Sequence, residues 1–158
     1  NVSPVEIVAS NLEKEDSPYS YRSTIVAEYN KKIIGMSLSF PGKYHKITEE
    51  MKAFFPKDRL KHFKYFFSAP VEDSYYIDAL CVEKAYRNKG IGSKLIDLTK
   101  RKVRKEGYKV LSLIVFADNL SAQNVYKKNG FELIEKIELK PHELMPHEGG
   151  CFLMNAVI

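Results

Sequence analysis

Cysteine is scarce in this sequence: its 158 residues include only Cys81 and Cys151, which belong to no Cys-x-x-Cys or Cys/His pattern. This spacing excludes the usual ligand sets of a zinc centre, and no metal site is predicted. We expect two reduced, half-buried thiols, as is typical of cytoplasmic proteins.

Long hydrophobic runs are lacking as well. No apolar stretch approaches the ~20 residues that a membrane-spanning helix needs, and no basic leader followed by an apolar core opens the chain. We therefore expect a cytoplasmic protein without a membrane partner. Internal repeats and low-complexity tracts are also missing, so residues 1–158 are interpreted as a single domain.

Positive charge is concentrated between residues 84 and 109, where ten basic residues face only two acidic ones, Asp97 and Glu106. Such a segment attracts an anion, which can be a nucleic-acid backbone or a phosphorylated cofactor, although a basic helix face is often only solvated. No alternation of aromatic and basic residues accompanies the charge. Nucleic acid is therefore not the predicted partner, and a nucleic-acid-binding module is kept as a rival hypothesis.

Hydrophobic patterning predicts an α/β (α+β) fold. The predicted strands cover residues 23–29, 33–40, 75–82, 110–116, 131–139 and 151–158. The predicted helices cover residues 47–68, with a break at Pro56, 90–106 and 119–129. Residues 1–20 are interpreted as an irregular arm with a short strand at residues 5–8. The strand–helix–strand order over residues 75–116 implies a right-handed parallel crossover.

The segment Arg87–Gly92, of sequence RNKGIG, joins a predicted strand to a predicted helix. A helix N-terminus presents free N–H groups and about half a positive charge, and glycine lets an anion approach the backbone. Leu95 stands where a dinucleotide-binding fingerprint has its third glycine, and the GxxxxGK[ST] pattern of nucleotide triphosphatases is missing. Neither of these two nucleotide-binding patterns applies, but the helix N-terminus and the glycines still predict that the segment holds a pyrophosphate.

The pattern R-x-x-G-x-G at Arg87–Gly92 resembles the acetyl-CoA-binding motif of the GCN5-related N-acetyltransferase (GNAT) family. Residues 119–131, which follow N-x-x-A-x-x-x-Y-x-x-x-G-F, are similar to a second segment typical of that family. The two together are much more specific than either alone. The resemblance covers about residues 22–139 and implies a mixed, mostly antiparallel sheet flanked by helices, with a parallel central strand pair that splays to admit the cofactor.

The same resemblance implies acetyl transfer from acetyl-CoA to a primary amine by direct attack, with Tyr126 as the general acid. A phenol with an ordinary pKa near 10 can protonate a leaving thiolate. The residues implied to bind acetyl-CoA are Leu80, Cys81, Val82, Arg87, Asn88, Lys89, Gly90, Ile91, Gly92, Ser93, Asn119 and Tyr126. Members of the family often form homodimers, so the resemblance also implies a homodimer. The rival on the same fold is a non-catalytic acyl-CoA-binding or regulatory domain.

Asp78 is a lone carboxylate inside an apolar strand. Burial would raise its pKa toward the range that suits a base for the attacking amine. It can instead be an outward-facing strand residue or a contact for a cationic substrate. Weaker alternatives are Glu72, Asp73 and the four histidines, His45, His62, His142 and His147, each expected to be an ordinary surface residue.

The N-terminal region departs from the family pattern. Only residues 1–20 precede Tyr21, which is too few for the strand and helices that the family places ahead of its hairpin. We expect either a compressed arm or further residues upstream of Asn1. Because those elements help to shape the acceptor pocket, the acceptor amine is not specified by the sequence. The connection over residues 43–73 is expected to shape selectivity.

Overall fold

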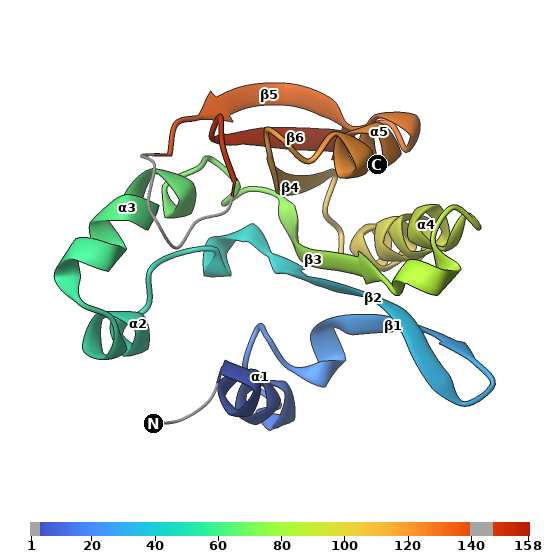
Figure 1. Ribbon diagram of the computed structural model, residues 1–158, viewed down its shortest axis with the longest axis horizontal. Coiled ribbons are helices and arrows are strands. Elements are labelled where there is room, and N and C mark those ends of the chain that lie inside the picture. The colour runs from blue at the N-terminus through green and yellow to red at the C-terminus, as the bar shows by residue number, and fades with distance from the viewer. Residues whose placement is uncertain (1–3, 140–146) are drawn as a thin grey trace.

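The structure, a computed structural model, describes residues 4–139 and 147–158 (Figure 1). Its sheet has the strand order β1-β2-β3-β4-β6-β5. The strands are β1 (Thr24–Tyr29), β2 (Lys32–Pro41), β3 (Tyr75–Val82), β4 (Val110–Phe116), β5 (Glu132–Ile137) and β6 (Cys151–Val157). The α-helices are α1 (Pro4–Glu13), α2 (Glu49–Phe54), α3 (Lys57–Phe67), α4 (Ile91–Lys105) and α5 (Leu120–Lys128). Neighbouring strands are antiparallel except β3 and β4, so the predicted mixed sheet is confirmed.

Helix α4 provides the predicted crossover between the two parallel strands. Its buried residues recur at helical spacing and pack against the sheet; they are Leu95, Ile96, Thr99 and Val103. Gly107 has a φ of 82° just beyond the helix, a conformation that glycine adopts without strain and that commonly ends a helix. None of the described helices is both long and apolar enough to cross a membrane.

The N-terminal segment differs from the prediction. Pro4–Glu13 forms helix α1 instead of an irregular arm with a strand at residues 5–8. Val5, Val8 and Leu12 recur at helical spacing, and Pro4 stands at the first helical position, where its missing N–H is not needed. Residues 4–13 thus contribute a helix, which lies below β1 and β2 in Figure 1.

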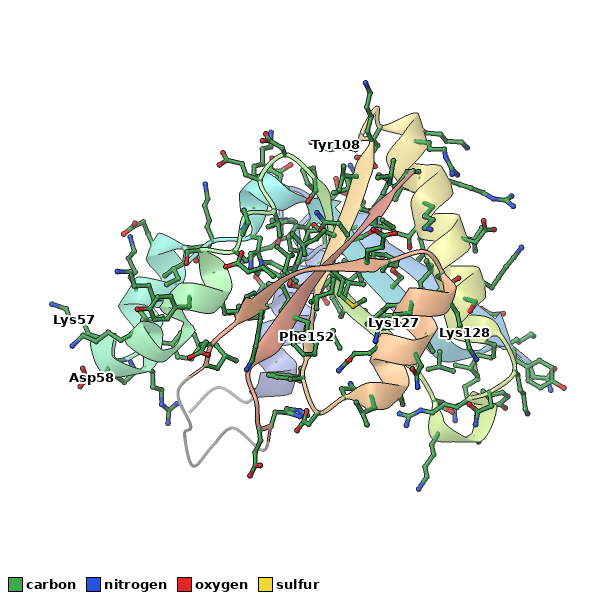
Figure 2. All side chains as sticks on the ribbon, turned by 90° about the horizontal axis from the view of Figure 1, so that it is seen from above. Lys57, Asp58, Tyr108, Lys127, Lys128 and Phe152 are labelled. Carbon is green, nitrogen blue, oxygen red and sulfur yellow. The ribbon has the colours of Figure 1, made fainter. Side chains whose placement is uncertain are left out.

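Buried side chains divide into two clusters on opposite faces of the sheet. One cluster, here named the α4 face, combines strand residues with side chains of α4 and α5; it includes Ile77, Leu111, Leu113, Ile96, Val103 and Tyr126. The other, here named the α3 face, combines strand residues with Phe66 and Ala69 from the end of α3 and the segment after it; its strand members include Phe40, Tyr76, Ile137, Cys151 and Leu153. Figure 2 shows Lys57 and Asp58 of α3 far from Lys127 and Lys128 of α5.

The sheet opens between β3 and β4. The two strands pair only at Tyr75–Leu111, Tyr76–Ser112 and Ile77–Leu113 and then continue apart. Figure 1 shows the consequence, with β1, β2 and β3 in one half and β4, β6 and β5 in the other. The structure therefore confirms the predicted parallel central pair that splays.

Asp78 occupies a β-bulge at the point where the sheet opens. It directly follows Ile77, the last residue of β3 that pairs with β4. In the ladder with β2, Ile77 lies opposite Ser39 and Ala79 lies opposite Leu38, so Asp78 is the additional residue. Bulges redirect side chains and are frequent beside active sites.

Candidate active site

The start of α4 presents backbone N–H groups that have no partner in the described part of the chain. The amides of residues 88–93 donate no hydrogen bond there, and the helical pattern begins with Lys94 N donating to Gly90 O at 3.0 Å. Gly90 is the N-cap and makes no side-chain cap. Free N–H groups at a helix N-terminus can bind anions, and the pyrophosphate that the sequence predicts for this segment stays a prediction.

Different constraints explain the glycines at positions 90 and 92 of this loop. Gly90 has a φ of 78°, the left-handed region that strains other residues. Gly92 needs no such backbone, and a Cβ added there would meet only Val125 Cγ1 at 3.9 Å, an ordinary contact. The fold itself therefore does not require glycine at position 92, whereas a ligand lying against that backbone would.

Charged side chains surround the same loop. Arg87 Nε donates to Val82 O at 3.0 Å, which ties the loop to the end of β3 and leaves the terminal guanidinium nitrogens without a partner among the described residues. Lys89 Nζ lies 5.2 Å from the centre of the Tyr86 ring. Both side chains are exposed, so two positive charges flank the free amides.

Ser93 is held in place by the far end of α5. Asn129 Nδ2 donates to Ser93 Oγ at 3.0 Å and also to Val125 O at 2.8 Å. Lys100 Nζ donates to Asn129 O at 2.6 Å. These bonds fix the first turn of α4 against α5, so the free amides keep a constant orientation.

Two residues of β3 direct their backbone groups into the opening. Glu83 N donates to Ile34 O of β2 at 2.8 Å, and the direction of backbone groups alternates along a strand. Cys81 therefore faces β2, whereas Leu80 and Val82 face the opposite edge, from which β4 has diverged. Val82 O on this edge already accepts from Arg87 Nε, whereas the other backbone groups of Leu80 and Val82 there need partners, which an extended ligand would supply.

Asp78 combines access to solvent with surroundings that disfavour its charge. Its side chain is exposed, yet loss of solvation by the surrounding protein raises its pKa to about 6. Burial raises the pKa of Tyr76 and of Tyr19, the latter to about 12, and the charge of Asp78 adds to both effects. Asp78 thus lies close to two phenols on the α3 face, neither of which the sequence singled out.

Tyr126 lies on the α4 face, buried to 8% exposure, with its ring edge-on to Phe131 at 5.7 Å. Its hydroxyl forms no hydrogen bond within the described residues. Burial raises its pKa, so the phenol keeps its proton at neutral pH.

Asn119 is the N-cap of α5, and its side chain accepts from Ala122 N at 3.2 Å. This bond occupies the side-chain oxygen and leaves the amide N–H groups free among the described residues. Beside it, His147 Nδ1 lies 2.9 Å from Asp118 Oδ1, and the His147 ring stacks on Phe116 at 3.9 Å. Asp118 and this stacking were not foreseen from the sequence.

The other predictions about histidine and cysteine need correction. His45 is not a surface residue: it is 5% exposed, its Nε2 lies 3.0 Å from Phe66 O, and burial lowers its pKa. The two thiols are not alike, since Cys81 is exposed and Cys151 is buried. His142 lies outside the described residues. Within the described ranges, no three His, Cys, Asp or Glu residues are grouped so as to hold a metal ion.

Comparisons with known proteins agree with this geometry. Residues 4–131 match the family model described as the acetyltransferase (GNAT) family. The chain is 39% identical over 57 residues to GCN5-related N-acetyltransferase 7, chloroplastic, of Arabidopsis thaliana, and this match spans 36% of the chain and 21% of that protein.

Solved structures share the fold at low sequence identity. An N-acetyltransferase from Staphylococcus aureus Mu50 superposes with a TM-score of 0.67 and 21% identity, covering 99% of this chain and 83% of that one. PaiA N-acetyltransferase from Thermoplasma acidophilum, in complex with coenzyme A, gives a TM-score of 0.55 and 18% identity over 85% of this chain and 60% of that one. With its motifs, its splayed sheet and the matching family model, this chain belongs to the acetyltransferase (GNAT) family.

Proposed function

We propose that this chain is an N-acetyltransferase that uses acetyl-CoA and a primary amine. The observation that carries the proposal is the position of the free amides at the start of α4 beside the opening between β3 and β4. An anion at the helix and an extended arm along Leu80 and Val82 fit one ligand that carries a pyrophosphate and a linear amide chain. Membership of an acetyltransferase family supports the same assignment.

The residues present fit acetyl-CoA as co-substrate. Residues 88–93 offer backbone N–H groups to the pyrophosphate, Arg87 and Lys89 offer positive charge, and Gly92 leaves the backbone open to close approach. Leu80 and Val82 would hydrogen-bond the pantetheine arm, and Asn119 would contact it from α5. In this proposal the acyl group lies in the opening where β3 and β4 separate, within reach of Asp78 of β3 and Tyr126 of α5.

The proposed reaction is direct acyl transfer. The amine nitrogen forms a bond to the thioester carbon, and the carbon–sulfur bond breaks with its electron pair leaving on sulfur. Tyr126 donates its hydroxyl proton to that sulfur, while Asp78 accepts a proton from the attacking amine, directly or through water. An acid with a raised pKa and a base with a pKa of about 6 both have the required protonation state near neutral pH.

Thiol release from acetyl-CoA, followed over a panel of primary amines, tests this function. Amine-dependent release supports it. Tight binding of acetyl-CoA without turnover on any amine would favour the non-catalytic binding domain instead.

Replacing Asp78 with asparagine should have opposite effects on activity and stability. In the unaltered protein, kcat/KM should rise with pH through about 6 as Asp78 loses its proton, and the Asp78→Asn variant should lose this rise. The pKa of Asp78 in the folded state lies above its value in the unfolded state. The stability that Asp78 contributes is therefore fully present below pH 4 and is lost as the pH rises through 6. The variant should therefore unfold at a higher temperature than the wild type at pH 7 and show no advantage below pH 4. A pH–rate profile that survives the substitution would remove Asp78 as the base.

A further inference from the structure

Tyr76 of β3 is a buried tyrosine whose hydroxyl has no partner in the described part of the chain. The side chain is 2% exposed, and the centre of its ring lies 5.8 Å from that of Phe40 and 4.3 Å from that of His45. The enclosed side-chain polar atoms without a partner are Ser39 Oγ and Asn155 Oδ1, and the Tyr76 hydroxyl is not one of them. The ring is therefore buried, while its hydroxyl tip reaches an open space.

The lack of a partner sets Tyr76 apart from the tyrosine beside it. Buried tyrosine hydroxyls usually find a hydrogen-bond partner, because a buried polar group without one lowers stability. Tyr75, which belongs to the α4 face, follows this rule: it is 2% exposed, and its hydroxyl donates to Glu106 Oε1 at 3.2 Å. The ring of Tyr76 alone would fill the same place in the core. Packing therefore explains the ring of Tyr76 but not its hydroxyl.

Tyr76 stands two residues before Asp78 on β3, and its ring belongs to the α3 face. Residues two apart along a strand point to the same side of a sheet. Burial is the main cause of the raised pKa of Tyr76, and the charge of Asp78 is the next, in agreement with a shared side. Pairing between β3 and β4 ends at Ile77, between these two residues. The hydroxyl and the carboxylate thus flank the point where the sheet opens.

The geometry of amine attack calls for two hydrogen-bond acceptors. A neutral primary amine has one lone pair and two N–H groups, and the lone pair must point at the thioester carbon. Each N–H that leaves water needs an acceptor in the protein. In the proposed function Asp78 accepts one of them, and the other has no assigned partner. A tyrosine hydroxyl can take this place, because its oxygen accepts as well as donates.

We propose that the Tyr76 hydroxyl oxygen accepts the second N–H of the attacking amine, so that Tyr76 and Asp78 together direct the nitrogen lone pair at the thioester. The inference rests on the proposed function. Tyr76 transfers no proton: once the carbon–nitrogen bond has formed, Asp78 takes one proton from nitrogen, and the N–H held by Tyr76 remains as the amide N–H of the product. The site therefore selects primary amines, because a secondary amine has no second N–H to offer.

Butylamine and N-methylbutylamine, compared in thiol-release assays, test the inference. The Tyr76→Phe variant should lower kcat/KM for butylamine about fivefold, as expected for one neutral hydrogen bond. The same value for N-methylbutylamine and the KM for acetyl-CoA should stay unchanged, so the preference for the primary amine shrinks by the same factor. The melting temperature should not fall, because no described residue loses a hydrogen bond.

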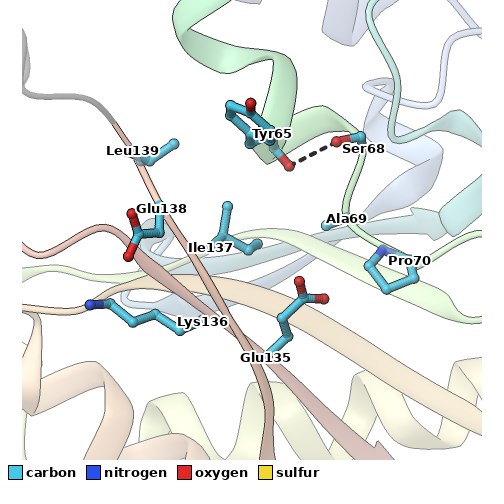
Figure 3. Close-up of a pocket in the computed structure, with 9 residues that line it drawn as sticks. All are labelled: Tyr65, Ser68, Ala69, Pro70, Glu135, Lys136, Ile137, Glu138 and Leu139. Atoms are coloured by element: carbon cyan, nitrogen blue, oxygen red, sulfur yellow. Dashed lines mark hydrogen bonds between the residues drawn. The ribbon is translucent and has the colours of Figure 1, made fainter.

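Two variants serve as controls. Tyr75→Phe removes a buried hydroxyl that does have a partner, Glu106, so it should lower the melting temperature and leave the preference between the amines intact. Glu135 lines a hollow of about 600 Å³ between residues 65–70 and 135–139 (Figure 3). Strand β6, with Leu153 at 0% exposure, lies between this wall and β4. Glu135→Gln should therefore change neither the preference nor the rate.

The possible outcomes separate this inference from the proposed function. An equal loss with both amines, or no loss with butylamine, overturns the role of Tyr76 while acetyl transfer stands. If N-methylbutylamine is not turned over, its inhibition constant against butylamine replaces kcat/KM in the comparison. Absence of thiol release with every amine contradicts the proposed function. Calorimetric titration then decides the contact alone: weaker binding of butylamine but not of N-methylbutylamine by Tyr76→Phe supports it, and unchanged binding of both rejects it.

Discussion

Replacing Tyr126 with phenylalanine should lower kcat by roughly 10²–10⁴-fold, the usual contribution of a positioned proton donor, and leave the affinity for acetyl-CoA largely unchanged. The leaving thiolate would then have to depart without a proton from the enzyme. Because burial raises the pKa of Tyr126, the wild-type phenol is protonated throughout the neutral range, so the loss should be similar at pH 6 and pH 8.

The fold should tolerate this substitution. The Tyr126 hydroxyl makes no hydrogen bond in the described part of the chain, so its removal leaves no buried partner unsatisfied, and the ring keeps its contact with Phe131. Tyr108, which follows α4 at the end remote from the loop (Figure 2), packs on the same cluster and gives the matched control Tyr108→Phe. If Tyr126→Phe retained the turnover of Tyr108→Phe, Tyr126 would not be the acid.

The Gly92→Asp variant should be more stable than the wild type and nearly unable to bind acetyl-CoA. An added Cβ meets only an ordinary contact. Replacing glycine within a helix and placing a negative charge in its first turn should together add about 0.5–1.5 kcal/mol to the free energy of unfolding. The same carboxylate would stand against the pyrophosphate, where two like charges about 4 Å apart cost about 4 kcal/mol at an effective dielectric constant of 20. We expect at least about a 100-fold loss of affinity.

The Gly92→Asn variant separates charge from bulk, since asparagine has nearly the same shape as aspartate. Its affinity for acetyl-CoA, measured by calorimetry beside that of Gly92→Asp, should be intermediate. Equal affinities of the two variants would mean that bulk alone excludes the ligand. Wild-type affinity in Gly92→Asp would show that the pyrophosphate lies elsewhere.

The proposed cofactor site is local in sequence, so the sequence alone was enough to propose it. A strand, a loop and a helix follow one another over residues 75–106, and the free amides at Gly90–Ser93 result from helix geometry alone. The proposed role of Tyr126 has the same kind of origin, because its motif lies within residues 119–131. The alternating and continuous apolar patterns also predicted the strands of the sheet.

The surroundings of Asp78, which form the proposed acceptor side, depend on contacts between distant segments and could not be predicted to the same degree. The bulge at Asp78 is visible only in the register of β3 against β2. Tyr19 and Tyr76 approach Asp78 through tertiary packing, and His45 is buried by residues of α3 about 20 positions away. Helix α1 was missed because its composition is mixed, although the spacing of Val5, Val8 and Leu12 and the position of Pro4 contained the signal.

Thermal unfolding of the unaltered chain with and without acetyl-CoA, with NAD and ATP as controls, tests the central claim that the start of α4 holds the pyrophosphate of this co-substrate. At about 100 times its dissociation constant, acetyl-CoA should add about 2.7 kcal/mol to the free energy of unfolding. NAD and ATP should add little, and the Gly92→Asp variant should lose the shift. A folded protein that shows no shift with acetyl-CoA, or a shift that Gly92→Asp retains in full, would contradict the account.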